Sequence, residues 1–306
     1  MRRVGYERSG GPEVLELSSA EVPTPGPGEL LVKVQAIGVT LPVVRKVRES
    51  ADPIPLGGEI AGEVIAVGDG VTGYTPGYRV TGLCFGHGYA DYAIVSARVA
   101  SPIPDGASAV DAVALVRSGL VALGALDAAR PAVGETALIT AAASGVGHLA
   151  VQLARVRGAS WVVGAVSDPA KADFVRSLGA DEVVTYAETA WGKAADYGLE
   201  AVGGDLLTPA LDALAPGGRL VAYSSGGGTI QAYDLLVGAK SVIGFQIRRI
   251  AEGQPEVYDH WRQELWQYFA SGQVRPVHTE FALADAAQAH AHVEARANLG
   301  KVVLIP

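Results

Sequence analysis

The stretch TALITAAASGVGHLAVQLARVRGASWVVGAV, residues 136–166, decides the fold class of this chain. An apolar run at 137–140 is followed by a turn of small residues at 141–147 and by an apolar-periodic segment at 148–157 that contains neither Pro nor Gly. A glycine turn and a second apolar run at 161–166 complete the pattern. Strand, tight turn, helix and strand in this order predict a βαβ unit.

The turn in this unit has the composition of a dinucleotide-binding loop. Small residues let the backbone approach a pyrophosphate, and the unpaired N–H groups at a helix N-terminus favour an anion. Ala142 and Ser144 stand where G-x-G-x-x-G has its first two glycines, and only Gly147 of the motif is present. We therefore predict that residues 144–147 contact a dinucleotide. The alternative is a purely structural βαβ crossover with a small-residue turn.

Length and composition set the broad class of the protein. The chain has 306 residues, of which 49% are hydrophobic and 18% charged, so a sizeable core in one large or two ordinary domains is expected. A net charge of −8 argues against a nucleic-acid partner. The single cysteine, Cys84, excludes an internal disulfide and a cysteine-rich zinc site. No signal peptide and no membrane-spanning run are visible, so we expect a cytoplasmic protein.

The remaining segments predict two domains. Residues 2–101 contain short apolar or alternating runs separated by Gly and Pro, which is typical of a compact β-barrel. Beyond them strands alternate with helices, which implies an α/β class with a parallel, doubly wound sheet. We expect the last strand of this sheet, residues 241–247, at the sheet edge. An uncovered apolar edge would pair with a second copy, so we predict a homodimer through this strand.

Several longer stretches resemble the medium-chain dehydrogenase/reductase superfamily, in its zinc-independent branch of quinone oxidoreductase-like and enoyl reductase-like proteins. They are LGGEIAGEVIAVGDGVTGYTPGYRV (56–80), GYADYAIV (88–95), AAASGVGHLAVQLAR (141–155), KADFVRSLGADEVVTY (171–186), APGGRLVAYSSGG (215–227) and the terminal LGKVVLIP. The resemblance implies a GroES-like β-barrel catalytic domain made of residues 1–107 and 248–306. It also implies a Rossmann domain that binds NADP, made of residues 108–247.

The same resemblance bears on metal binding. Relatives that use zinc carry Cys, His and Cys at positions that match Thr40, Gly58 and roughly Arg117. None of these residues supplies a thiolate or an imidazole, the ligands typical of zinc, so we predict no metal site. Three of the scattered histidines are expected at the surface or in turns rather than as ligands: His87, His148 and His260.

The choice of cofactor follows from charge. The second strand ends at Val166 and Ser167, where NAD-specific folds carry an acidic residue for the ribose 2′-hydroxyl. Without that carboxylate nothing repels a 2′-phosphate. Quinone oxidoreductases hold this phosphate with a Lys, a Tyr and an Arg, which Lys171, Tyr186 and Arg296 match. The resemblance therefore implies NADPH.

Residues that follow the later strands would line the nicotinamide end of the cofactor. The complete set of predicted cofactor contacts is Ser144, Gly145, Val146, Gly147, Ser167, Lys171, Tyr186, Val202, Tyr223, Ser224, Ser225, Gly244, Phe245, Gln246 and Arg296. On the catalytic side the chain departs from its relatives, because the Asn and Asp of G-V-N-x-x-D are absent from residues 38–44 and Val121 replaces a Thr. Thr40 and Ser118 are the predicted hydrogen-bond donors to a substrate oxygen.

These features predict an NADPH-dependent reductase that transfers hydride, without zinc, to a quinone or an α,β-unsaturated carbonyl as its small-molecule substrate. Two alternatives stay open. One is a dedicated enoyl reductase of a biosynthetic pathway, and the other is an NADPH-binding relative without catalytic activity.

Overall fold

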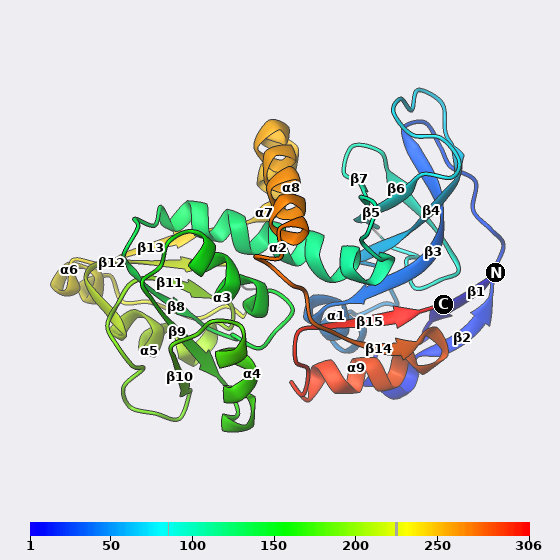
Figure 1. Ribbon diagram of the computed structural model, residues 1–306. Helices are drawn as coiled ribbons and strands as arrows, with labels where there is room; N and C mark the ends of the chain where they lie inside the picture. The colour runs from blue at the N-terminus through cyan, green and yellow to red at the C-terminus, as the bar shows by residue number, and fades with distance from the viewer. Residues whose placement is uncertain (85, 224–225) are drawn as a thin grey trace. The chain divides into compact units, whose positions relative to one another are not determined.

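The computed structural model describes residues 1–84, 86–223 and 226–306, and the chain divides into two compact units. The first unit is Met1–Arg117 together with Pro276–Pro306, and the second is Ser118–Arg275. Figure 1 labels the elements of both units.

The first unit is rich in strands, as predicted. Its main sheet has the strand order β14-β15-β3-β4-β5-β7, with β6 paired to β3, and β1 and β2 form a separate hairpin. The strands are β1 (Arg2–Gly5), β2 (Glu16–Ser19), β3 (Glu29–Val39), β4 (Glu59–Val67), β5 (Arg79–Leu83), β6 (Tyr92–Ser96), β7 (Ser101–Pro102), β14 (His278–Ala282) and β15 (Lys301–Ile305). The helices are η1 (Pro12–Val14), α1 (Leu41–Glu49), η4 (Leu283–Asp285) and α9 (Ala286–Glu294).

Strand β3 is the centre of this sheet. It pairs with β4 along one edge, while β6 and β15 share the other edge, β6 on residues 29–33 and β15 on residues 37–39. Leu30, Val32 and Ile37 are fully buried as a result. A strand enclosed in this way reads as a nearly continuous apolar run, which explains the sequence ELLVKVQAIGV.

The second unit contains a six-stranded sheet in which every pair is parallel. Its order is β10-β9-β8-β11-β12-β13, the doubly wound order expected from the sequence. The strands are β8 (Thr136–Ile139), β9 (Trp161–Val166), β10 (Glu182–Thr185), β11 (Ala195–Glu200), β12 (Leu214–Ala222) and β13 (Ser241–Gly244). The helices after β8 are α3 (Gly147–Val156), η2 (Pro169–Lys171), α4 (Ala172–Ser177), η3 (Gly204–Leu206), α5 (Leu207–Asp212), α6 (Ala232–Gly238), α7 (Ile247–Gly253) and α8 (Pro255–Ala270).

The predicted βαβ unit is present as β8, α3 and β9. Strand β8 lies between β9 and β11, so the strand order changes direction there. Helix α3 is buried from Gly147 to Ala154, because its apolar residues pack onto the sheet. In open α/β sheets ligands bind outside the carboxyl ends of the strands at such a switch point, which makes the loop between β8 and α3 the first place to look for a site.

The observed division of the chain differs from the predicted domain boundaries after residues 107 and 247. Helix α2 (Ala109–Ala129) begins after the first predicted boundary, and the observed division falls inside this helix, between Arg117 and Ser118. Helix α8 packs on α2: the Trp261 indole N–H donates to Asp127 at 2.7 Å, and a Cβ added at Gly119 would lie 2.7 Å from Leu265. These contacts assign α8 to the second unit.

The last strand of the parallel sheet is shorter than predicted. β13 pairs with β12 only from Ser241 to Gly244, because β12 itself ends at Ala222. The chain then turns into α7 instead of continuing as a strand to residue 247. Its predicted place at the sheet edge is confirmed.

Helix α2 has the length and mean hydropathy of a membrane-spanning helix, although the sequence predicted no membrane-spanning run. However, 78% of its apolar window is buried inside the protein. The same composition is expected of the core helix of a folded domain.

Candidate functional site

The turn between β8 and α3 is tight and internally bonded. Ala141 has φ of 47°, and its carbonyl accepts a hydrogen bond from the Ser144 N–H at 2.8 Å. The Gly147 N–H donates to the Ser144 hydroxyl oxygen at 3.1 Å. A Cβ at Gly147 would lie 2.0 Å from the Ala141 carbonyl oxygen, so only glycine fits there. This explains why Gly147 is the one glycine of the motif that the chain contains.

The N-terminus of α3 offers donors to an anion. The backbone N–H groups of Gly145 and Val146 have no acceptor among the residues that the structure describes, and both residues are partly exposed. They stand at the positive end of a ten-residue helix. His148 is fully buried in the first turn of α3, with its Nδ1 atom 2.9 Å from the Ser144 carbonyl oxygen, so its predicted surface position was wrong.

The loop after β9 carries no free carboxylate. Ser167 is exposed directly after the buried Val166. The side chain of Asp168 caps η2 by accepting a hydrogen bond from the Ala170 N–H at 2.8 Å. Lys171 ends the same short helix and is partly buried.

Tyr186 joins the loop after β10 to the turn after β8. Its hydroxyl oxygen accepts a hydrogen bond from the Ala141 N–H at 2.8 Å, and its own N–H donates to the Val166 carbonyl at 3.0 Å. Its ring lies 5.6 Å from that of Trp191. The predicted phosphate contact is therefore also a structural support of the turn.

The loops after β11 and β12 are organised by Glu200, which the sequence analysis missed. Glu200 is 1% exposed, and its carboxylate accepts hydrogen bonds from the N–H groups of Val202 at 2.6 Å and Gly203 at 2.8 Å. The signal was an acidic residue at a strand end before A-V-G-G. The buried Tyr223 hydroxyl has no hydrogen-bond partner within the part of the chain that the structure describes, and burial, together with the negative charge of Glu200, raises its pKa. Ser224 and Ser225 lie outside the described residues.

The residues after β13 have a packing role that the strand pattern did not predict. The Phe245 N–H donates to the Ala222 carbonyl at 2.9 Å. The Phe245 ring lies 6.4 Å from the ring of Trp261, and a Cβ at Gly124 would lie 2.3 Å from it. On either side of it, Gly244 and Gln246 are exposed.

In the first unit, Thr40 and Gly58 are neighbours. Thr40 lies between β3 and α1, at the N-cap of the helix, but its buried hydroxyl makes no capping bond and has no partner among the described residues. A Cβ at Gly58 would lie 4.0 Å from that hydroxyl oxygen. Neither residue is a zinc donor, and no group of three His, Cys, Asp or Glu side chains in the described ranges could hold a metal ion.

Beside this pair lies a buried ion pair that the sequence analysis also missed. Glu59 is 2% exposed and Lys301 is 4% exposed, and their side chains form a salt bridge. The Arg117 Nε atom lies 3.5 Å from the second carboxylate oxygen of Glu59. Burial lowers the pKa of Lys301. A Cβ at Gly38 would lie 2.2 Å from the Glu59 carboxylate, so β3 must have glycine there.

The predicted sites are divided between the two units. Lys171 and Tyr186 belong to the second unit, whereas Arg296 belongs to the first, where it is exposed after α9 with φ of 55°. Thr40 belongs to the first unit. Ser118 opens the second and is only 3% exposed inside α2, so it presents little surface to a substrate.

Comparison with known proteins agrees with both units. Residues 26–105 match the alcohol dehydrogenase GroES-like domain, and residues 145–265 match the family described as zinc-binding dehydrogenase. A quinone oxidoreductase of Pseudomonas aeruginosa is 33% identical over 100% of this chain and 99% of its own length. The chain belongs to the medium-chain dehydrogenase/reductase superfamily, in its quinone oxidoreductase-like branch.

Two further relatives bear on function. The solved quinone oxidoreductase of Escherichia coli complexed with NADPH has a TM-score of 0.91 at 28% identity and covers 100% of both chains. The spectinabilin polyketide synthase system protein NorB of Streptomyces orinoci is 35% identical over 91% of this chain, which corresponds to 13% of that protein. The predicted fold, a GroES-like domain with a Rossmann-type parallel sheet, is confirmed.

Proposed function

We propose that this chain is an NADPH-dependent oxidoreductase that reduces a quinone or an α,β-unsaturated carbonyl. The observation that carries the proposal is the carboxyl edge of the parallel sheet. There the α3 N-terminus offers unpaired N–H groups at Gly145 and Val146, and no uncommitted carboxylate follows Val166. Membership of the quinone oxidoreductase-like branch and the NADPH complex of the Escherichia coli relative support it.

The residues of the second unit suit a phosphorylated dinucleotide. Gly147 lets the turn close tightly at the N-terminus of α3, because any side chain there would meet the Ala141 carbonyl. Lys171 and Tyr186 stand on the loops after β9 and β10, where the 2′-phosphate of the adenosine would lie by family likeness. Arg296 belongs to the first unit, and its contact with the phosphate remains a prediction of the family resemblance alone. When bound, NADPH supplies the hydride and its two electrons to the substrate.

On the substrate side we assign Thr40 as the hydrogen-bond donor to the carbonyl oxygen. The Thr40 hydroxyl is buried and has no partner in residues 1–84, 86–223 and 226–306, so its O–H can be donated without breaking another bond there. The positive charges of Lys301 and Arg117 together exceed the single negative charge of Glu59. This positive balance favours the negative charge that develops on the oxygen as hydride arrives, and solvent supplies the final proton.

The proposed reaction does not use zinc. Thr40, Gly58 and Arg117 stand at the positions where zinc-dependent relatives carry their ligands, and this set does not fit the metal. Dialysis against a chelator should leave the turnover number unchanged within twofold. Loss of activity that added zinc restores would overturn this part of the proposal.

The direct test is oxidation of NADPH, followed by its absorbance, with a panel of quinones and enones. We expect turnover with some members and a KM for NADPH at least tenfold below that for NADH. Tight NADPH binding without turnover across the panel would favour the non-catalytic alternative. Preference for NADH would overturn the cofactor assignment.

A second candidate function is a dedicated enoyl reductase of a biosynthetic pathway. The similarity to a segment of a polyketide synthase system protein favours it. An acyl thioester with a 2,3-double bond, presented free or on a carrier protein, distinguishes the two functions. A kcat/KM for the thioester at least tenfold above that for any quinone would establish this second candidate.

We also propose a cytoplasmic homodimer that forms through β13. The strand lies at the sheet edge, and the adjacent helix α6 exposes Tyr233, Leu236 and Val237 at 71%, 75% and 68%. Apolar side chains beside an open edge favour pairing with a second copy. Light scattering should give twice the chain mass for the wild type and the chain mass for L236E. A monomeric wild type at micromolar concentration would overturn the dimer.

A further inference from the structure

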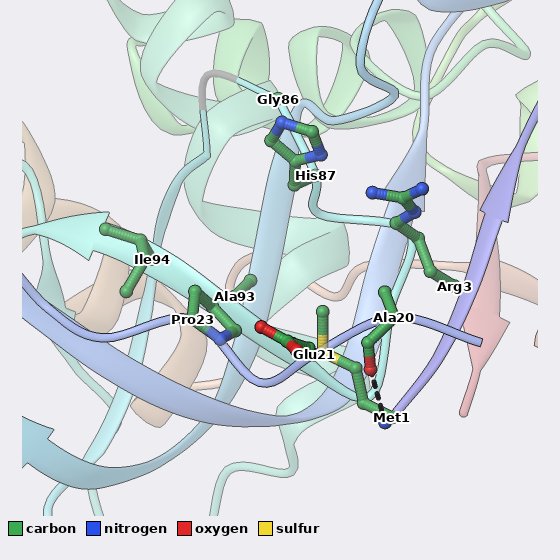
Figure 2. Close-up of a pocket in the computed structure, with 9 residues that line it drawn as sticks. All are labelled: Met1, Arg3, Ala20, Glu21, Pro23, Gly86, His87, Ala93 and Ile94. Carbon is green, nitrogen blue, oxygen red and sulfur yellow. Dashed lines mark hydrogen bonds between the residues drawn. The ribbon is translucent and has the colours of Figure 1, made fainter.

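The first unit contains a pocket of about 290 Å³ that is separate from Thr40 and Gly58. It lies between the N-terminal hairpin, the segment that follows β2, the loop before β6, and β6 itself (Figure 2). Its lining includes Arg3, Glu21, Pro23, His87, Ala93 and Ile94. By the volume of liquid water it has room for about ten molecules.

The lining of the pocket is mostly apolar and contains two cationic or basic side chains. Pro23, Ala93 and Ile94 form apolar walls, and Ala93 is fully buried. The Arg3 guanidinium and the His87 imidazole have no polar partner among the described residues. Arg2, the chain neighbour of Arg3, instead makes a two-pronged contact with Asp91.

The loop that carries His87 is held in a strained form. His87 has φ of 56°, and Gly86 has φ of 115°. The loop is fixed behind His87 by the Gly88 N–H, which donates to the Leu56 carbonyl at 2.7 Å. A residue with a Cβ in the left-handed region is uncommon, and such residues concentrate at ligand-binding positions. Here the strain places an imidazole at the pocket.

We propose that this pocket binds a small organic carboxylate with an apolar body. The guanidinium of Arg3 matches a carboxylate in geometry and charge, and His87 supplies a second donor. Figure 2 shows these two side chains in one part of the pocket and Glu21 in another. The apolar walls would cover a ring or short alkyl group, which inorganic phosphate lacks. Glu21 is exposed and makes no contact with the carboxylate in this arrangement.

The test is a ¹⁹F NMR titration of the whole protein with 4-fluorobenzoate, with and without saturating NADPH, which separates this pocket from the cofactor site. We expect saturable binding that NADPH leaves unchanged within twofold. 4-Fluorobenzamide, which has the ring without the charge, should bind at least tenfold more weakly. Inorganic phosphate should not displace the benzoate. Equal binding of the amide, displacement by phosphate, or loss with NADPH would each overturn the proposal.

Three variants locate the ligand. R3A should lower the affinity for 4-fluorobenzoate at least tenfold. The matched control is R8A, which replaces an exposed arginine of the same segment and should change this affinity less than twofold. R3K keeps the charge and should restore part of the affinity, which excludes loss through misfolding. E21Q should leave binding unchanged or tighten it. A fivefold loss of affinity in E21Q, or equal effects of R3A and R8A, would overturn the proposal. These outcomes do not depend on whether the chain reduces quinones.

Discussion

The phenolic oxygen of Tyr186 accepts a hydrogen bond from the backbone N–H of Ala141 at 2.8 Å, so the loop after β10 supports the turn after β8. One side chain thus combines a structural contact with the predicted contact to a 2′-phosphate. The hydroxyl can accept from Ala141 and donate its own proton to a phosphate oxygen at the same time. This double role makes Tyr186 the most informative residue of the cofactor site.

The first prediction concerns Y186F. Removal of the hydroxyl leaves the Ala141 N–H unpaired and deletes a phosphate contact, so the KM for NADPH should rise about tenfold, the equivalent of about 1.4 kcal/mol. The KM for NADH, which has no 2′-phosphate, should change less than threefold. Steady-state kinetics with both cofactors measure the two effects. Y233F on the exposed face of α6 is the control, and equal losses for NADPH and NADH would contradict the assignment.

The second prediction concerns Ala141 itself, which has φ of 47°. A left-handed conformation costs a residue with a Cβ roughly 1–2 kcal/mol, and glycine avoids this cost. Glycine also raises the conformational entropy of the unfolded chain, which lowers the stability of the fold by about 0.4–1 kcal/mol. A141G should therefore stabilise the protein by about 0.5–1 kcal/mol, measured by urea denaturation. A137G, inside β8, should destabilise the protein, because glycine within a strand raises the entropy of the unfolded chain and leaves no side chain to pack. A destabilised A141G would show that the methyl group packs in a way the backbone angle does not reveal.

Much of the fold could be predicted because its signals are local. The pattern of 136–166 predicts β8, α3 and β9, and the observed elements begin and end within a few residues of that pattern. The doubly wound order follows, since alternating strands and helices permit few arrangements of a parallel sheet. The end of β13 could not be predicted, because it depends on where its partner β12 stops.

The residues of the candidate sites also differ in whether the local sequence could predict them. Ser144 and Gly147 are bonded in the turn as their spacing suggests. Glu59 and Lys301 are 242 positions apart, so no local pattern pairs them, and a charged residue in a sequence is read as exposed by default. Glu200 was missed for a different reason: its partners are backbone N–H groups, so no second side chain in the sequence marks its role.

The third prediction concerns the buried pair of Glu59 and Lys301. K301M leaves the Glu59 carboxylate buried with only Arg117 nearby, which should cost about 3–5 kcal/mol of unfolding free energy. The double variant E59Q/K301M removes both charges and should recover at least half of that loss. Urea denaturation of the single and double variants gives the coupling directly. As a control, R248A breaks the exposed pair with Glu252 and should cost less than about 0.5 kcal/mol. Additive losses in the double variant would show that the two side chains do not act as a pair.

The fourth prediction concerns acid stability. His290 of α9 is fully buried, with its Nε2 atom 3.1 Å from the hydroxyl of Tyr89, which is itself buried. Burial lowers the pKa of His290 to about 4. A hydroxyl can donate to the neutral ring but offers no charge to balance an imidazolium, and no described residue bonds the Nδ1 atom of His290.

The sign of the effect follows from proton uptake. Between its ordinary pKa of about 6.5 and the lowered value, the unfolded chain binds a proton at His290 that the folded chain does not, so folding weakens as the pH falls through this range. From pH 7 to pH 5 this one residue should remove about 2 kcal/mol of unfolding free energy. H290Q should reduce the loss of unfolding free energy between pH 7 and pH 5 by that amount. Its stability at pH 7 will be lower than that of the wild type, because the packing of the ring is lost. H260Q, at an exposed position on α8, should leave the wild-type slope in place. Parallel pH profiles for H290Q and the wild type would show that the buried ring does not resist protonation.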